Sequence, residues 1–323
     1  MDADAGTDLN WLKLAIFWLG YLYFPATVLI AWIMFRVRFL PRALLVLFWL
    51  GITGLAYARF IEPQQLHVME RAVVLERCVE DKGELRLAVV ADPHIGLFRN
   101  AISIDRIAGK LNDLDADAIL IAGDFTYHLD EAHFDAVFAP IGRLSAPVFG
   151  VLGNHDVGLP GPDVSATLAP SLSRIGMQNI ENKTKRFFTD NADVDLVGLP
   201  EFLAMTQNRD LLLGHSVRPR ILLVHNPDTV FAMGPHHHFD LMIAGHTHGG
   251  QINLGPLTCV IASMACRVVR EGFKQTPRGL VFVTAGTGMV NLPFRFLVPP
   301  RIDVLDITYQ KCREQGEARN DNP

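Results

Sequence analysis

The stretch LRLAVVADPH, residues 85–94, decides the fold class of this chain. Its first seven residues are an almost continuous apolar run, which is typical of a strand buried on both faces. The run ends abruptly at Asp92 and His94, two side chains that can carry chemistry. In an open α/β sheet, functional groups collect at the carboxyl ends of the strands. A buried strand followed directly by polar groups is therefore the pattern to follow along the chain.

Six further short apolar runs continue this pattern. They lie at 118–122, 148–152, 194–199, 221–224, 241–244 and 280–284. Between the first two runs of the chain, apolar residues at helical spacing predict a helix over 104–114, with Ser103 as its N-cap. A second helix is predicted over 134–141, which Pro140 could shorten. Strands alternating with helices predict βαβ units, and the shorter later connections predict a partly mixed sheet system.

Polar side chains follow five of these runs directly. They are Asp92, His94, Asp124, Asn154, His155, Asp156, His225, His246 and His248. Gly123, Gly153 and Gly245 each precede one of them, at points where the chain is expected to turn sharply. Ordinary turns capped by Asn, Asp and Gly would be the simplest alternative, but five such ends in order argue against it.

Seven of these side chains are candidate metal ligands, namely four His, two Asp and one Asn. Imidazole and carboxylate together suit Mn, Fe and Zn. A single catalytic zinc needs about three protein ligands, so seven candidates fit two ions that share a bridging carboxylate. Two ions about 4 Å apart suit phosphoryl chemistry, because they activate water and neutralise phosphate oxygens.

These blocks resemble, in order and in spacing, the signature of the calcineurin-like metallophosphoesterases, over about residues 85–310. The block Gly245–Gln251, the His-Asn-Pro at 225–227 and the segment 293–300 are similar to the bacterial membrane-associated, phosphodiesterase-like branch. Pro93 departs from that branch, which often has an apolar residue such as Leu there. The resemblance implies an α/β fold, a four-layer α/β/β/α sandwich, here with an N-terminal pair of transmembrane helices.

The resemblance also implies a role for each residue. Asp92, His94, Asp124 and His248 would hold a first metal ion, with Asp124 bridging. A second ion would be completed by Asn154, His225 and His246. His155 would protonate the leaving oxygen or stabilise the transition state, and Asp156 would orient it. The implied reaction is phosphodiester cleavage by a metal-bound hydroxide, with Mn as the first choice among Mn, Fe and Zn.

Several other residues are weaker candidates. His128 follows Asp124 closely and Asn226 follows His225, so both are expected near the substrate. The His tract at 236–238 is expected in a solvated loop. The segment 294–301 is expected as ordinary core and strand, or as a lip that contacts lipid.

The apolar excess of the chain lies at its start. Residues 14–35 form a 22-residue run without charge, long enough for the roughly 30 Å of a bilayer. A second uncharged run, 43–58, has 16 residues, and Arg42 and Arg59 at its ends could lengthen it by snorkelling. Three arginines lie in the short loop 36–42, which favours a cytoplasmic loop and an outward-facing remainder if both runs span. If the second run does not span, the remainder of the chain is expected in the cytoplasm. Cleavage near Ala58, after a run that resembles an internal signal sequence, is a separate alternative.

The expected organisation is thus an anchor over 1–60, a charged connector over 61–84, a catalytic domain over 85–310 and a polar tail over 311–323. The location expected is a bacterial inner membrane, with the catalytic domain on the periplasmic side. The 323 residues carry 34 acidic and 29 basic side chains, so no nucleic-acid partner is expected. Four cysteines without C-x-x-C spacing indicate neither a zinc site nor a redox pair.

Three functions remain open at this stage. The first is a membrane-anchored dimetal phosphodiesterase acting on a phosphate ester, with lipid-linked esters among the candidate substrates. The second is a pyrophosphatase of a lipid precursor such as UDP-2,3-diacylglucosamine, which the anchor favours and the outward orientation disfavours. The third, from another class, is a non-catalytic, metal-containing binding module in the membrane. The sequence leaves the oligomeric state open.

Overall fold

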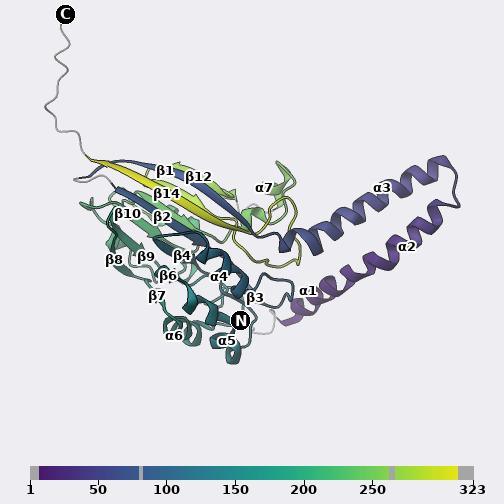
Figure 1. The fold of residues 1–323 in the computed structure, drawn as a ribbon, viewed down its shortest axis with the longest axis horizontal. Coiled ribbons are helices and arrows are strands. Elements are labelled where there is room, and N and C mark those ends of the chain that lie inside the picture. The colour runs from purple at the N-terminus through teal and green to yellow at the C-terminus, as the bar shows by residue number, and fades with distance from the viewer. Residues whose placement is uncertain (1–6, 80–82, 262–265, 312–323) are drawn as a thin grey trace, which may run out of the picture.

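Two six-stranded sheets form the centre of the molecule in the computed structural model, which describes residues 7–79, 83–261 and 266–311 (Figure 1). The first sheet has the order β1 (His67–Val79), β14 (Arg301–Lys311), β2 (Gly83–Val90), β4 (Ala118–Ala122), β6 (Val148–Val151) and β7 (Met177–Asn179). The second has the order β12 (Gly272–Thr276), β13 (Gly279–Val283), β11 (Leu241–Ala244), β10 (Arg220–Leu223), β9 (Asp193–Gly198) and β8 (Lys183–Phe188). A small ladder pairs β3 (Ile95–Gly96) with β5 (Thr126–Tyr127).

Most strand pairs in both sheets are parallel, including the outermost pair of the first sheet, β1–β14. Strands β2, β4, β6 and β7 run parallel, as do β9, β10, β11 and β13. The pairs β8–β9, β12–β13 and β14–β2 are antiparallel. All seven predicted strands are present, and the sheets are mixed as expected. The carboxyl ends of the parallel strands therefore deliver their following residues to one region.

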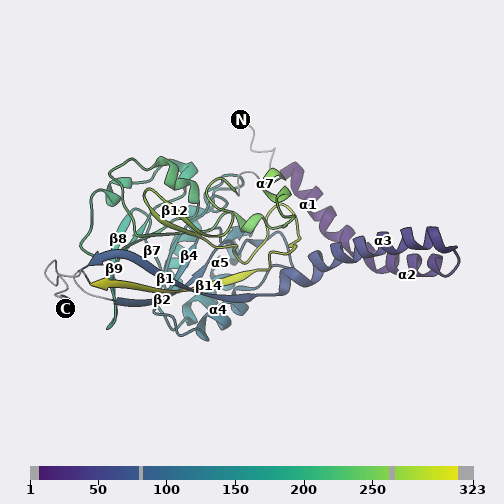
Figure 2. The same cartoon turned by 90° about the horizontal axis from the view of Figure 1, so that it is seen from above.

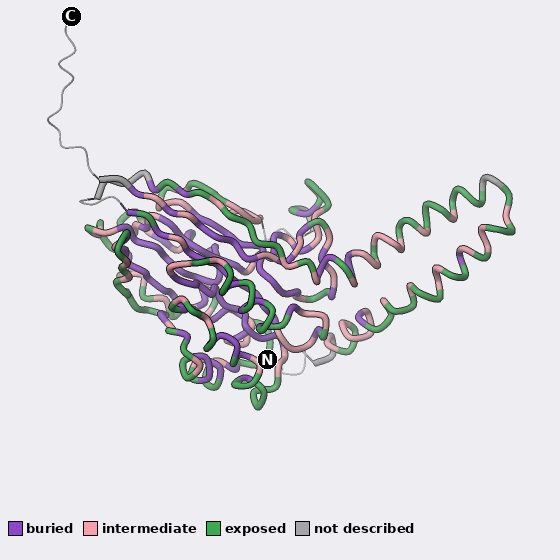
Figure 3. The backbone as a smooth tube through the Cα atoms, in the orientation of Figure 1, coloured by how far each residue is buried: buried purple, intermediate pink, exposed green. Residues whose placement is uncertain are grey.

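Apolar side chains fill the space between the sheets and cover their outer faces. One core cluster joins residues of both sheets, for example Leu87 of β2 and Leu223 of β10. A second lies between the first sheet and the helices α4 (Ile104–Asn112), α5 (Phe134–Phe138) and α6 (Ser165–Ile175). Short 3-10 turns, η7 (Arg209–Leu212) and η8 (Pro227–Ala232), cover the second sheet. Figure 3 shows the buried backbone running through this centre.

The two predicted helices form close to their expected bounds. Helix α4 begins after Ser103, whose hydroxyl accepts a hydrogen bond from the backbone N–H of Arg106 at 3.3 Å. Helix α5 ends at Phe138 and continues as the 3-10 turn η5 (Ala139–Arg143), which contains Pro140. Pro140 thus marks the shortening that its missing N–H predicts.

The segment expected as a connector is part of the first sheet. Its residues form most of strand β1, which pairs with β14 from His67–Arg301 onward. Val73 and Leu75 are buried while Val74 between them is exposed, the alternation of a half-buried strand. Charged residues conceal this period in the sequence. Of the expected polar tail, all but residue 311 lies outside the described residues.

The two apolar runs form a long antiparallel hairpin that projects away from the sheets (Figures 1 and 2). Helices α1 (Thr7–Leu19) and α2 (Tyr23–Met34) are joined by the 3-10 turn η1 (Gly20–Leu22), and α3 (Phe39–Ala56) returns beside α2. Two stretches, Asn10–Met34 and Pro41–Gln64, are long and apolar enough to cross a membrane. The hairpin tip carries the arginines of the loop 36–42, and helix α1 and the sheets lie at its other end.

Both arginines that were expected to lengthen the second run have contacts within the protein. Arg42 donates to the backbone oxygens of Met34 and Val37 and so closes the hairpin tip. Arg59 is 1% exposed, and its guanidinium lies 3.9 Å from the centre of the Phe17 ring. The second helix reaches its length by continuing through a π turn, η2 (Tyr57–Ile61), and a 3-10 turn, η3 (Glu62–Gln64).

Candidate metal centre

The strand ends bring the expected ligand residues together, and most of them leave the strand in an unusual backbone conformation. The left-handed region, with φ between 47° and 71°, is occupied by Asp92, His94, Asp124, His246 and His248. Such values cost about 1–3 kcal/mol each for residues other than glycine and cluster at functional sites. Five of them around one point indicate a site that the rest of the fold holds in place.

One group of potential ligands contains Asp92, His94 and His248. Their candidate ligand atoms all lie within 4.8 Å of one another, and all three residues are buried. The Nε2 atoms of His94 and His248 are 3.0 Å apart, and His248 Nε2 is 3.7 Å from an oxygen of Asp92. Three donor atoms therefore face a common point.

A second group contains Asp124, His225 and His246, again within 4.8 Å. The side-chain oxygen of Asn154 completes it, at 2.9 Å from His225 Nε2 and 2.8 Å from His246 Nδ1. Asp124 connects the two groups, because one of its oxygens lies 3.3 Å from His94 Nε2 and 3.2 Å from His225 Nε2. This is the position expected for a bridging carboxylate.

The donor set of the second group fits a cation. His225 Nδ1 lies 2.7 Å from the carbonyl oxygen of Ala122, so Nδ1 carries a proton. When the ring is neutral, Nε2 therefore has no proton and presents a lone pair. That lone pair faces oxygens of Asn154 and Asp124, which are acceptors as well. Atoms that only accept can approach so closely only around a cation or a proton.

The electrostatics of the cluster show the same demand for positive charge. Burial would lower the pKa of His225, but the carboxylates of Asp124 and Asp92 outweigh it and raise that pKa well above the usual range. Burial raises the pKa of Asp92 to about 6, with a further contribution from the charge of Asp124. Burial and the charge of His225 lower the pKa of His246 to about 3. A divalent ion bound here would supply the positive charge that a proton on His225 otherwise supplies, with neutral imidazoles and carboxylates as its ligands.

His155 lies beside the two ligand groups. Its backbone N–H donates to Asp124 at 2.9 Å, and its ring is 5.0 Å from that of His94, measured between centroids. Its Nδ1 lies 3.1 Å from the carbonyl oxygen of Pro160. Burial lowers the pKa of His155 to about 4, although the charge of Asp124 acts in the opposite direction. The resting ring is neutral, with its proton on Nδ1.

The hydrogen bonds of Asp156 among the described residues go to groups other than the His155 ring. Its carboxylate accepts four hydrogen bonds of 3.0–3.1 Å, from the backbone N–H groups of Phe125, Thr126 and Gly153 and from the Thr126 hydroxyl. Burial and the charge of Asp124 raise its pKa to about 6, so it is ionised at neutral pH. Asp156 thus joins the loop after β4 to the loop after β6, and the Pro160 carbonyl orients His155.

The three glycines before the ligands are required for different reasons. Gly123 has a φ of +81°, as a sharp turn requires. Gly153 and Gly245 are required by space instead. A Cβ on Gly153 would lie 2.1 Å from an oxygen of Asp124, and one on Gly245 would lie 2.8 Å from an oxygen of Asp92.

The two expected substrate contacts differ in position. Asn226 is buried and accepts from the backbone N–H of Asp228 at 2.9 Å, so it caps the turn η8. Its amide also faces Glu201 at 3.4 Å, a buried carboxyl that the sequence reading missed although it follows strand β9. His128 is half-buried at the rim, where its ring packs edge-on against that of Tyr127.

The remaining candidates have structural roles. In the segment 294–301, Arg295 is fully buried and donates to the backbone oxygens of Ala285, Gly286, Gly288 and Val298. Leu297 is 61% exposed, so it is the residue of this segment that fits the expected lip in contact with lipid. In the His tract, His237 accepts from the backbone N–H of Gly234 and so closes its own loop.

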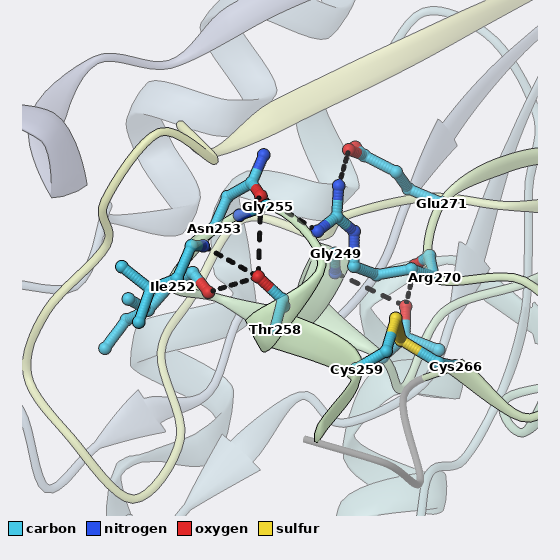
Figure 4. The surroundings of a disulfide bond; sticks show 11 residues. Gly249, Ile252, Asn253, Gly255, Thr258, Cys259, Cys266, Arg270 and Glu271 are labelled. Atoms are coloured by element: carbon cyan, nitrogen blue, oxygen red, sulfur yellow. Dashed lines mark hydrogen bonds and ion pairs between the residues drawn. A yellow bond between two sulfur atoms is a disulfide. The ribbon is translucent and has the colours of Figure 1, made fainter. Parts of the chain in front are cut away.

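A disulfide closes the loop that follows the last ligand block. Cys259 and Cys266 are bonded, although their spacing had indicated no redox pair. Figure 4 shows Arg270 beside this loop, where it donates to the Asn253 side chain at 3.0 Å. The Arg270 carbonyl also accepts a hydrogen bond from the Thr247 hydroxyl. Arg270, four residues after the disulfide, thus contacts the ligand block through its carbonyl oxygen. Disulfide bonds persist in oxidising compartments.

Comparison with known proteins agrees with this geometry. The sequence profile described as calcineurin-like phosphoesterase matches residues 85–250, half of the chain. The chain is 28% identical over 265 residues to the uncharacterized metallophosphoesterase YkuE of Bacillus subtilis, covering 79% of this chain and 90% of that protein. It is 24% identical over 258 residues to the phosphodiesterase YaeI of Escherichia coli, covering 79% and 93%.

A more distant relative is the UDP-2,3-diacylglucosamine pyrophosphatase LpxG of Chlamydia trachomatis. The identity is 22% over 316 residues, covering 79% of this chain and 93% of that protein. With the matched profile spanning both ligand groups, the chain belongs to the calcineurin-like phosphoesterase family and is a metallophosphoesterase.

Proposed function

We propose that the chain is a membrane-anchored phosphodiesterase that works with two divalent metal ions, Mn being the first choice. The observation that carries this proposal is the pair of ligand groups joined by Asp124, whose one oxygen lies 3.3 and 3.2 Å from a histidine of each group. The name of the relative YaeI supports a diester over a monoester.

In this proposal Asp92, His94 and His248 hold one ion, and Asn154, His225 and His246 hold the other, with Asp124 between them. When bound, the ions would activate a water molecule and neutralise the phosphoryl oxygens. The protein's own groups orient the substrate and move the proton.

His155 is the proposed proton carrier. The Pro160 carbonyl fixes the proton on Nδ1, so Nε2 is the atom that would deliver a proton to the leaving oxygen. Because its pKa is lowered to about 4, the ring would take up that second proton only together with the anionic substrate. Asp156 would act by fixing the backbone on which His155 stands.

We further propose that residues 1–60 anchor a catalytic domain of residues 85–310 in a bacterial inner membrane, with that domain on the periplasmic side. The arginines at the hairpin tip support a cytoplasmic tip. The Cys259–Cys266 disulfide supports an oxidising compartment for the domain. A reporter fused after residue 65 tests this placement, and cytoplasmic activity of the reporter would refute it.

The lipid-precursor alternative keeps one supporting observation, the similarity to LpxG. The two activities, and the binding module, are separated by one assay. Full-length protein loaded with Mn²⁺ is offered a soluble phosphodiester, a phosphomonoester and UDP-2,3-diacylglucosamine. We expect the diester to be cleaved fastest. Preference for the nucleotide-linked lipid would favour the pyrophosphatase, and no hydrolysis at full metal occupancy would favour the binding module.

A His155→Ala variant tests the mechanism in the same assay. We expect turnover to fall about 10²–10⁴-fold, the range for loss of a general acid. Metal content, measured by mass spectrometry, should stay at the wild-type level, because His155 is not among the proposed ligands. Loss of both metals together with activity would contradict this assignment.

A further inference from the structure

The membrane anchor carries a cationic side chain to the edge of the metal centre. Lys13 of helix α1 donates a hydrogen bond from Nζ to the hydroxyl of Tyr127 at 2.5 Å. Its Nζ lies 5.0 Å from the centre of the Tyr127 ring. That ring packs edge-on against His155 at 5.0 Å and His94 at 5.4 Å, measured between centroids. A single aromatic ring therefore separates Lys13 from the proposed proton carrier and a proposed ligand.

Helix α1 is fixed in this position by the next turn of the same face. Phe17, four residues after Lys13, is 3% exposed and stacks on Phe98, with their centroids 6.4 Å apart. Phe17, Phe98, Tyr127 and Met289 form one buried apolar cluster. The guanidinium of Arg59 covers the other side of Phe17 and donates to its backbone oxygen at 3.3 Å. Lys13 is thus held at the site by packing.

The opposite side of α1 is apolar and exposed. Trp11 is 64% exposed, Trp18 is 55% exposed and Leu19 is 59% exposed. Tryptophan and leucine in such a position are typical of a helix that lies at the boundary between lipid and water. With one face on the catalytic domain and the other toward lipid, α1 places Lys13 between the membrane surface and the metal centre.

The polar surroundings of Lys13 are simple in the part of the chain that the structure describes. There, no carboxylate forms an ion pair with it within 4.0 Å, and its hydrogen-bond partner is the hydroxyl of Tyr127. Its charge nevertheless reaches the rim, because burial and the Lys13 charge together lower the pKa of His128. An ammonium that has no carboxylate partner among the described residues, at the edge of a phosphoesterase centre, suits the binding of a phosphate oxygen.

We propose that Lys13 binds an anionic oxygen of the substrate at the membrane-facing rim and favours phosphodiesters presented at a membrane surface. This deepens the proposed function and depends on it. Lys13 is in this view a specificity-determining residue supplied by the anchor, so that the catalytic domain is complete only with α1 in place. Tyr127 holds the ammonium in position through its hydroxyl, which also accepts from the backbone N–H of Asn291 at 3.4 Å.

The test compares full-length wild type, Lys13→Met and Lys13→Arg in lipid nanodiscs with Mn²⁺. Lys110→Met serves as the matched control, because Lys110 is exposed on α4. The soluble probe is bis(4-nitrophenyl) phosphate. For Lys13→Met we expect KM and the inhibition constant of inorganic phosphate to rise about 10-fold, the size of one charged hydrogen bond. We expect kcat and metal content to stay within about two-fold, and Lys13→Arg to restore most of the binding.

A second experiment distinguishes a phosphodiester in solution from one in a lipid headgroup. With phosphatidylglycerol vesicles as the probe, the loss caused by Lys13→Met should be at least as large as with the soluble diester. A loss confined to the soluble diester would overturn the membrane-facing role. Unchanged KM and phosphate inhibition, or an equal loss in Lys110→Met, would overturn the proposal as a whole.

Calorimetric titration of inorganic phosphate into metal-loaded protein keeps this test independent of turnover. If wild type hydrolyses nothing, the proposed function fails, and phosphate affinity still reports on Lys13. If wild type is active and Lys13→Met binds phosphate as tightly, only the inference about Lys13 fails.

Discussion

Replacement of Asp156 by Asn tests whether this carboxylate holds the loops of the site together. The carboxylate accepts four hydrogen bonds of 3.0–3.1 Å, two on each oxygen. An amide presents one acceptor and one donor in their place. In its less costly orientation the amide nitrogen faces Thr126, whose hydroxyl can rotate to accept. The backbone N–H of Thr126 then loses its acceptor.

The expected loss of stability follows from these contacts. A buried amide without an acceptor costs about 1–3 kcal/mol. The hydrogen bonds that remain lose the charge on their acceptor, and charged hydrogen bonds are roughly twice as strong as neutral ones. We therefore expect the free energy of unfolding to fall by about 3 kcal/mol. For a domain of about 150–250 residues this lowers Tm by about 6–12 °C.

The assay is thermal unfolding in detergent micelles at pH 8, followed by circular dichroism. At that pH Asp156 is ionised, because its pKa is about 6. Asp163→Asn is the matched control, since Asp163 is exposed in the same loop and its acceptor contact to Ser165 can be kept by an amide. We expect its Tm to stay within about 2 °C of wild type. An Asp156→Asn variant that melts like the control but turns over like His155→Ala would refute this reasoning and restore the role of Asp156 in orienting the His155 ring.

Three further predictions concern the site and its surroundings. Gly245→Ala should reduce bound metal by more than half in mass spectrometry, because its Cβ would lie 2.8 Å from an oxygen of Asp92. The control is Gly109→Ala in α4, which should keep full metal occupancy because the space around Gly109 is open. Burial raises the pKa of Glu201, so the folded chain holds that proton more tightly and loses stability as pH rises from about 4.3 through the raised value. Glu201→Gln should remove that loss in chelated protein, and an unchanged dependence of Tm on pH would contradict it. Chelation should lower the Tm of wild type, and added Mn²⁺ should raise it with concentration, since only the folded chain presents the assembled ligands; a Tm indifferent to both would argue against a resident metal.

The centre of the site was predictable because its ligand residues follow the strands of the sheets in the same order along the sequence. Each buried run ends at a polar block, and parallel strands carry those blocks to one edge, so Asp92 and His225 meet although 133 positions of sequence numbering separate them. The runs are continuous and apolar, which makes them visible without any long-range information. The same holds for α4, whose Ser103 cap and apolar face are local signals.

What could not be predicted depends on contacts between distant segments. Strand β1 is stabilised by pairing with β14, more than 200 residues later, and its charged residues hide its alternation. Three of the four hydrogen bonds to Asp156 come from backbone N–H groups, which the sequence does not distinguish by residue type. No local signal in the sequence marks Lys13, because its place at the site depends on the packing of Phe17 against Phe98.

The passage from the second apolar helix into the sheet has a consequence for how the protein would meet its substrate. The helical turns end at Gln64 and strand β1 begins at His67, while Glu62 accepts from the backbone N–H of Val298 at 2.6 Å. In the proposed topology no flexible linker joins the anchor to the catalytic domain, so the metal centre would lie at a fixed height above the bilayer. The rate would then follow the density of substrate within the surface, and dilution of the surrounding solution would change it little.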